Sequence, residues 1–230
     1  LFKQGFNVVR LNLRDHGNSH HLNEKIFHSC RIQEVINACI HIQHEFKQPI
    51  SIIGFSLGAN FALRINAFST SNQLALNNTI SFCPVIDPGS TLEALENSLL
   101  VYRRYFMRRW KASFYQKSET FPHLFSKEIF DQCKTLRQAT EVLATRYAGF
   151  NNLQSYLEGY SIAGDRLNTL QTSAHIVLAK DDPIIPWKDQ SKLAVSEHTI
   201  ITLTEHGGHC GFLEYDLSSP WIEQFSLLHL

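Results

Sequence analysis

The stretch ISIIGFSLGANFALRINAF, residues 50–68, most strongly limits what this chain can fold into, because a strand pattern passes directly into a helix pattern. Residues 50–55 form a short apolar run typical of a buried strand, and residues 57–68 have helical periodicity. Ser56, at the junction, must take a strained backbone conformation in such a sharp turn. Strand and helix pass close together there, so we expect small residues at 54 and 58, and both are glycine. The motif GFSLG therefore predicts a nucleophilic serine at a sheet edge.

Strand and helix patterns alternate along most of the chain. Apolar, β-branched runs predict strands over 7–13, 79–83, 175–179 and 199–203, helical patterns cover 26–46, and the alternation continues to 219–228. Such alternation predicts an α/β fold with a mostly parallel sheet and helices on both faces. Residues 92–161 are instead helical, aromatic and basic, which predicts an inserted helical cap. We expect a single domain over 1–230, with its core in 1–91 and 162–230.

Composition excludes several classes of function. A chain of 230 residues with 43% hydrophobic residues can fill a core without disulfides or metals. Lys plus Arg and Asp plus Glu both number 21, so a nucleic-acid partner is not expected. The five scattered cysteines lack a CxxC pair, which favours a reducing, cytoplasmic setting. The sequence contains neither a signal peptide nor an apolar stretch of about 20 residues, so we expect no transmembrane segment.

A serine nucleophile needs a base, and His209 is the best candidate among twelve histidines. It lies in EHGGHCGF, a glycine-rich loop that directly follows the predicted strand 199–203. His206 shares this loop, whereas His41, His44 and His123 have the pattern of solvated or packed side chains. A metal site at His206, His209 and Cys210 is the alternative, but the spacing lacks HExxH or paired cysteines, so we expect no metal.

Asp182 is the predicted acid of a catalytic triad. It lies in AKDDPIIP after the predicted strand 175–179, where it can fix the imidazole tautomer. Asp181 is the near alternative and Asp87 a more distant one; of the adjacent pair only one can reach the histidine, and the other would stabilise the turn. The helix that begins after Ser56 directs its first amides at a developing oxyanion, which makes the Leu57 N–H the predicted first donor.

Two further motifs have structural and functional interpretations. Arg14-Asp15-His16-Gly17 resembles a catalytic cluster, but we favour a structural loop in which Gly17 allows a bend and Arg14 holds backbone or carboxylate groups. The arginine-rich YRRYFMRRW in the predicted cap could contact an anionic membrane surface. For this segment we favour a solvated helix face.

Together these motifs resemble the YheT-like branch of the α/β-hydrolases, which is related to the plant embryogenesis-associated hydrolases and the animal abhydrolase-domain lipases. The matching segments are NVVRLNLRDHGNS, GFSLGAN, YRRYFMRRWKASF, TRYAGFNNLQSYLEGYS, LAKDDPIIP and EHGGHCGFLE. The family pattern resembles GGHxGF, which implies His209 as the catalytic histidine, and the DDP motif implies Asp182 as the acid. The resemblance implies an α/β-hydrolase fold, hydrolysis of small-molecule acyl esters or lipids, and no cofactor.

The resemblance also reveals a departure at the start of the chain. Family members begin with further strands and an HG-containing oxyanion loop, which this sequence lacks, so we expect N-terminal strands to be missing by truncation. The leading hypothesis is a serine carboxylester hydrolase that uses Ser56, His209 and Asp182. The alternatives are a weak or silent hydrolase-fold module without the oxyanion loop, and an acyltransferase that uses the same triad.

Overall fold

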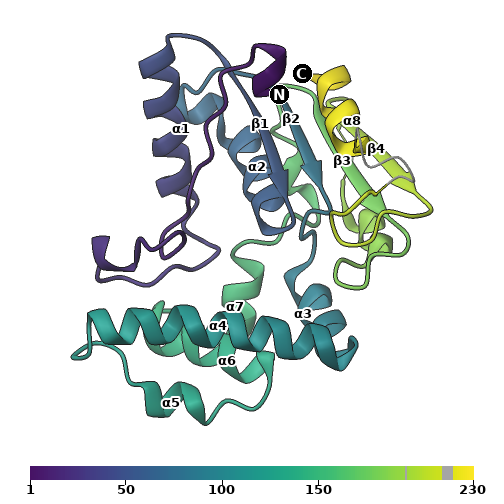
Figure 1. Ribbon diagram of the computed structural model, residues 1–230. Coiled ribbons are helices and arrows are strands. Elements are labelled where there is room, and N and C mark those ends of the chain that lie inside the picture. The colour runs from purple at the N-terminus through teal and green to yellow at the C-terminus, as the bar shows by residue number, and fades with distance from the viewer. Residues whose placement is uncertain (195, 214–219) are drawn as a thin grey trace. The chain divides into compact units, whose positions relative to one another are not determined.

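The computed structural model describes residues 1–194, 196–213 and 220–230, which form two compact units (Figure 1). The first unit contains residues 1–8, 32–91 and 161–230. The second contains residues 9–31 and 92–160. Residues 9–31, which we expected in the core, thus group with the helical insertion.

The first unit is built on a four-stranded parallel sheet with the strand order β1-β2-β3-β4 (Figure 1). The strands are β1 Ile50–Phe55, β2 Leu76–Phe82, β3 Ala174–Ala179 and β4 Thr199–Thr204. Every residue of β3 is buried, as expected for an inner strand of a parallel sheet. Because the strands are parallel, the loops that follow them all leave from the same edge. Any functional side chains in these loops can therefore meet.

Helices flank this sheet. They are α1 Ile32–Phe46, α2 Leu57–Phe68 and α8 Trp221–His229, and α3 Pro88–Asn97 follows β2. α2 packs against β1 and β2, and its central residues from 59 to 67 are all buried. This burial explains why the helix is apolar on nearly every side. The α/β architecture predicted from the alternating pattern is therefore correct.

The predicted strand over 7–13 is wrong. Residues 6–13 form no strand, and the side chains of Val8 and Val9 are about half exposed, at 53% and 50%. A strand exists only where its backbone groups pair with a neighbour, and β1 pairs with β2 alone among the described strands. An apolar, β-branched sequence was therefore not sufficient to form a strand here.

The helix predicted over 26–46 begins later, at Ile32. The Phe27 N–H donates to Asp15 at 2.7 Å, and the Arg31 side chain donates to the Ile26 carbonyl at 2.8 Å. These bonds hold the segment in a loop, so the helix starts only beyond it.

The second unit contains the remaining helices. They are α4 Leu100–Thr120, α5 Lys127–Asp131, α6 Leu136–Val142, a π-helical turn at Leu143–Tyr147, and α7 Leu153–Glu158. Its core is aromatic: the rings of Phe114 and Phe130 stack with centroids 4.3 Å apart, and Phe125 meets Phe114 edge to face. No helix within the described ranges is both long enough and apolar enough to cross a membrane.

A buried ion pair joins residues 9–31 to α4. The Lys117 ammonium, fully buried, lies 2.9 Å from the Asp15 carboxylate and donates also to the carbonyls of His20 and Asn23. A buried ammonium needs such partners to offset the loss of hydration. Asp15 therefore has a structural role in this loop, as we favoured from the sequence.

Candidate active site

Ser56 occupies the turn between β1 and α2. Its backbone angles are φ 53° and ψ −118°, a region that residues other than glycine rarely adopt, and its N–H donates to the Phe82 carbonyl at 2.9 Å. A Cβ atom added to Gly54 would lie 2.4 Å from the Gly58 carbonyl oxygen, so strand and helix do pass too close for a side chain there. We also expected that position 58 requires a small residue, and this expectation was wrong, because a Cβ atom on Gly58 would meet no atom within 4 Å.

This asymmetry predicts opposite results for two matched variants. Gly54→Ala should lower the free energy of unfolding by about 2 kcal/mol or more, because the methyl group must displace backbone atoms of α2. Gly58→Ala should change it by no more than about 1 kcal/mol, and in the stabilising direction, because alanine favours a helix. Urea unfolding of the two variants measures both values; equal destabilisation would contradict the close approach at Gly54.

His209 lies in the loop after β4, and the structure brings it to Ser56. Its Nε2 atom is 3.0 Å from the Ser56 Oγ atom, although 153 positions separate the two residues. Its Nδ1 atom is 3.0 Å from Oδ2 of Asp182, which follows β3. The three side chains thus form one continuous line of hydrogen bonds at the carboxyl ends of β1, β3 and β4.

The Asp182 carboxylate is held rigidly. Its second oxygen, Oδ1, accepts hydrogen bonds from the N–H groups of Ile184 and Ile185 at 2.8 and 3.0 Å. The side chain is only 1% exposed, so water cannot readily compete for the imidazole. Asp182 is therefore oriented by its own loop toward His209.

The two rival aspartates have other partners. Asp181 accepts from the Gly208 N–H at 2.8 Å, a bond that lowers the pKa of its carboxyl group, and it lies 3.5 Å from the exposed His206. It thus steadies the loop that carries His209. Asp87 accepts from Lys192 at 2.7 Å and from the Gly89 N–H at the start of α3, and the lysine helps to lower the pKa of Asp87 against the opposing effect of burial.

Two opposing effects determine the pKa of His209. Burial disfavours the charged imidazolium and so lowers the pKa, whereas the hydrogen bond and negative charge of Asp182 raise it. The second effect prevails, and the pKa of His209 lies above its ordinary value of 6.5. The imidazole is therefore a stronger base than a histidine in water.

The Leu57 N–H is free to act as a donor. Leu57 is the first residue of α2, and the first amides of a helix have no acceptor within that helix. Among the described residues, its N–H makes no backbone hydrogen bond. It therefore suits a negatively charged oxygen beside Ser56.

The other sequence candidates lie outside this group. His16 makes a hydrogen bond through Nδ1 to the Arg14 carbonyl at 2.8 Å, and Arg14 donates to the Lys25 carbonyl at 3.0 Å. The three other histidines singled out, His41, His44 and His123, are exposed. Arg14 and His16 thus belong to the structural loop of the second unit.

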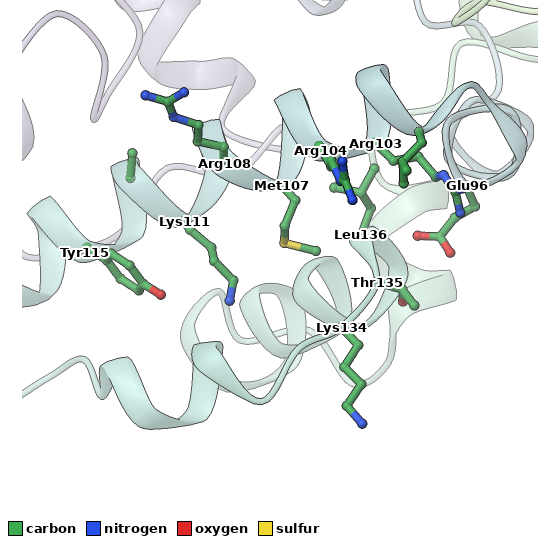
Figure 2. Close-up of a pocket in the computed structure, with 12 residues that line it drawn as sticks. Glu96, Arg103, Arg104, Met107, Arg108, Lys111, Tyr115, Lys134, Thr135 and Leu136 are labelled. Atoms are coloured by element: carbon green, nitrogen blue, oxygen red, sulfur yellow. The ribbon is translucent and has the colours of Figure 1, made fainter.

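The arginine-rich face of α4 borders a pocket within the second unit. Its volume is about 590 Å³, and Figure 2 shows its cationic side chains beside the apolar Met107 and Leu136. The cations are Arg103, Arg104, Arg108, Lys111 and Lys134. None of the three residues of the serine–histidine–aspartate group lines this pocket.

Sequence reasoning missed Cys83 and Lys117. Cys83 directly follows β2, and its thiol lies beside His209 and Cys210. The available signal was its position, because a residue that ends the strand next to β1 must reach the same edge as Ser56. Lys117 gave no comparable signal, since a lysine among exposed cations on one helix normally faces solvent.

A parallel α/β sheet with a serine, a histidine and an aspartate joined by hydrogen bonds beyond its strands defines a hydrolase-type protein. Comparison of the sequence with known protein families agrees with this class. The model of the alpha/beta hydrolase family matches residues 1–218, and the chain belongs to this family.

The chain is similar to three known proteins, two in sequence and one in structure. The chain is 26% identical to "Putative esterase YheT" of Escherichia coli (strain K12), over 96% of its own length and 66% of that protein. It is also 26% identical to the monoacylglycerol lipase ABHD2 of Danio rerio, over 75% of its length and 44% of that protein. An alpha/beta fold family hydrolase from Bacillus anthracis str. Sterne aligns with a TM-score of 0.45 and 16% identity, covering 86% of this chain and 71% of that one. The chain thus spans 66% of the length of YheT and less than half of the length of the zebrafish lipase.

Proposed function

We propose that this protein is a serine carboxylester hydrolase, with Ser56 as nucleophile, His209 as base and Asp182 as the orienting acid. One observation carries the proposal: His209 lies 3.0 Å from Ser56 Oγ through one ring nitrogen and 3.0 Å from Asp182 through the other. A serine hydroxyl attacks a carbonyl only when a base accepts its proton, and this arrangement supplies both the base and its tautomer.

The proposed reaction has two halves. Ser56 Oγ attacks the acyl carbonyl while His209 Nε2 takes its proton, and the Leu57 N–H donates to the resulting oxyanion. The imidazolium then returns the proton to the leaving alcohol, which leaves an acyl group on Ser56. Water attacks this acyl-enzyme while His209 takes its proton; the imidazolium then returns the proton to Ser56 Oγ as the bond from the acyl carbon to this oxygen breaks and the acid is released. None of these steps needs a cofactor or a metal.

The substrate class is a small acyl ester or lipid. The names of YheT and of the zebrafish lipase support an ester, and the aromatic segment 92–161, which we propose to be the substrate cap, favours an apolar acyl group. The cysteines of the structure are free thiols, which supports a reducing, cytoplasmic setting.

An ester panel with product analysis tests this function. The protein should release the alcohol from p-nitrophenyl esters of several chain lengths, and mass spectrometry should find the free acid as the second product. Appearance of the acyl group on an added alcohol instead of water would identify acyl transfer. Absence of turnover on every chain length, with the protein folded, would contradict the proposal.

The pH dependence of hydrolysis should follow His209. Only the neutral imidazole can accept the serine proton, so kcat/KM should rise with pH through the pKa of His209 in the free enzyme. Since Asp182 raises that pKa, the midpoint should lie above 6.5. A midpoint below 6.5, measured with a neutral ester, would contradict the assigned partnership with Asp182.

A further inference from the structure

Two thiols and an imidazole meet at the carboxyl ends of β2 and β4. Cys83 directly follows β2, and Cys210 directly follows His209. One ligand atom from each of the three residues lies within 4.8 Å of the other two. The proposed reaction uses His209 but neither of the thiols.

The thiols have only weak partners at present. The Cys83 thiol donates to the Gly208 carbonyl at 3.8 Å, and the Cys210 thiol donates to the Phe82 carbonyl at 3.7 Å. A thiol is a weak donor, so both bonds are easily replaced. Cys83 is fully buried, but Cys210 is partly exposed and the His209 side chain is 19% exposed, which gives a small ion access to the group.

We propose that Cys83, Cys210 and His209 form a binding site for Zn²⁺, and that the bound ion inhibits the enzyme. Two thiolates and one imidazole are a ligand set that zinc prefers, with water in the fourth position. On binding, two S–H bonds break, two Zn–S bonds form, and two protons pass to solvent. The imidazole donates a nitrogen lone pair, and no electron is transferred.

The spacing requires only a small adjustment. Zinc–sulfur bonds of about 2.3 Å and zinc–nitrogen bonds of about 2.0 Å place tetrahedral ligand atoms roughly 3.5–3.8 Å apart. Ligand atoms within 4.8 Å reach that separation by side-chain movements of about 1 Å. Binding itself removes the two thiol protons, because a thiol that coordinates a metal ion is deprotonated.

The inhibition by zinc rests on the proposed function, and it follows because His209 is both the proposed base and one of the three zinc ligands. His209 uses one ring nitrogen for Ser56 and the other for Asp182. Whichever nitrogen binds zinc, the imidazole can no longer both face Asp182 and accept the serine proton. Zinc should therefore stop turnover, and a chelator should restore it.

The binding test uses Co²⁺ as a spectroscopic probe and Zn²⁺ as its competitor, under a reductant that does not bind metals. The Ser56→Ala protein should bind one Co²⁺ with a thiolate charge-transfer band, and Zn²⁺ should abolish the band. Cys83→Ser and Cys210→Ser should each weaken binding at least about tenfold. The matched control is Cys39→Ser, a buried thiol of α1 outside the group, which should bind as the parent protein does.

A second measurement needs no substitution. Zinc should protect the partly exposed Cys210 of the unmodified protein from alkylation, as read by peptide mass spectrometry, while the reactivity of Cys30 stays unchanged. Absence of both the band and the protection would overturn the proposal, and so would zinc inhibition that persists in Cys83→Ser and Cys210→Ser. Because neither binding readout requires turnover, the site is tested even if the protein hydrolyses no ester.

Discussion

Replacing Ser56 with alanine should lower kcat for ester hydrolysis by about 10⁶-fold. The residual rate would come from substrate binding and the Leu57 N–H, because neither depends on the hydroxyl. The variant should remain folded, since the Ser56 side chain makes its described hydrogen bond only to His209 and alanine keeps the backbone N–H bond to Phe82. Steady-state kinetics on the preferred p-nitrophenyl ester measures the effect.

Ser71→Ala is the matched control for this variant. Ser71 carries an exposed hydroxyl that donates to the Phe68 carbonyl at the end of α2 and accepts from the Asn72 side chain, so its loss should leave kcat within about twofold. A Ser56→Ala protein that retains a tenth or more of the parent activity would rule out Ser56 as the nucleophile.

Replacing Asp182 with asparagine should lower kcat by about 10⁴-fold, the second largest effect that we expect. The asparagine oxygen can keep the bonds from Ile184 and Ile185, so the loop should hold its shape. Its amide group, however, would donate to His209 Nδ1 and favour the wrong tautomer, with the proton on the nitrogen that faces Ser56.

Asp181→Asn separates this effect from a general disturbance of the loop. The asparagine at position 181 keeps an oxygen that can accept from the Gly208 N–H. The Asp181 side chain contacts His206 but makes no described hydrogen bond to His209, so activity should fall by less than about tenfold. If Asp181→Asn proved as damaging as Asp182→Asn, the assignment of the acid between the two would be wrong.

The sequence allowed the sheet and the three proposed catalytic residues to be predicted for a physical reason. Strands β3 and β4 are apolar runs that end directly before a polar or glycine-rich loop, and β1 ends at the sharp turn that holds Ser56. Parallel strands bring these connections to a common edge. The local pattern of apolar strands therefore predicted that residues far apart in the chain meet at one edge of the sheet. The strand β2 also existed where expected, although it begins at Leu76, three positions before the predicted start.

Features that depend on pairing or packing could not be predicted in the same way. Whether residues 7–13 form a strand depends on a neighbouring strand, which their own composition does not specify. Gly58 fitted the expected motif, but only the backbone path shows that Gly54 alone needs the space. Asp181 stayed an alternative to the predicted Asp182 because the sequence does not give the directions of two adjacent side chains, and the burial of Lys117 depends on a partner 102 positions away.

Covalent labelling tests the central claim most directly. The protein should react with a fluorophosphonate probe, and peptide mass spectrometry should locate a single adduct on Ser56, which disappears in His209→Ala. A folded protein that the probe leaves unlabelled, or that carries the adduct on another residue, would contradict the proposed roles of Ser56 and His209.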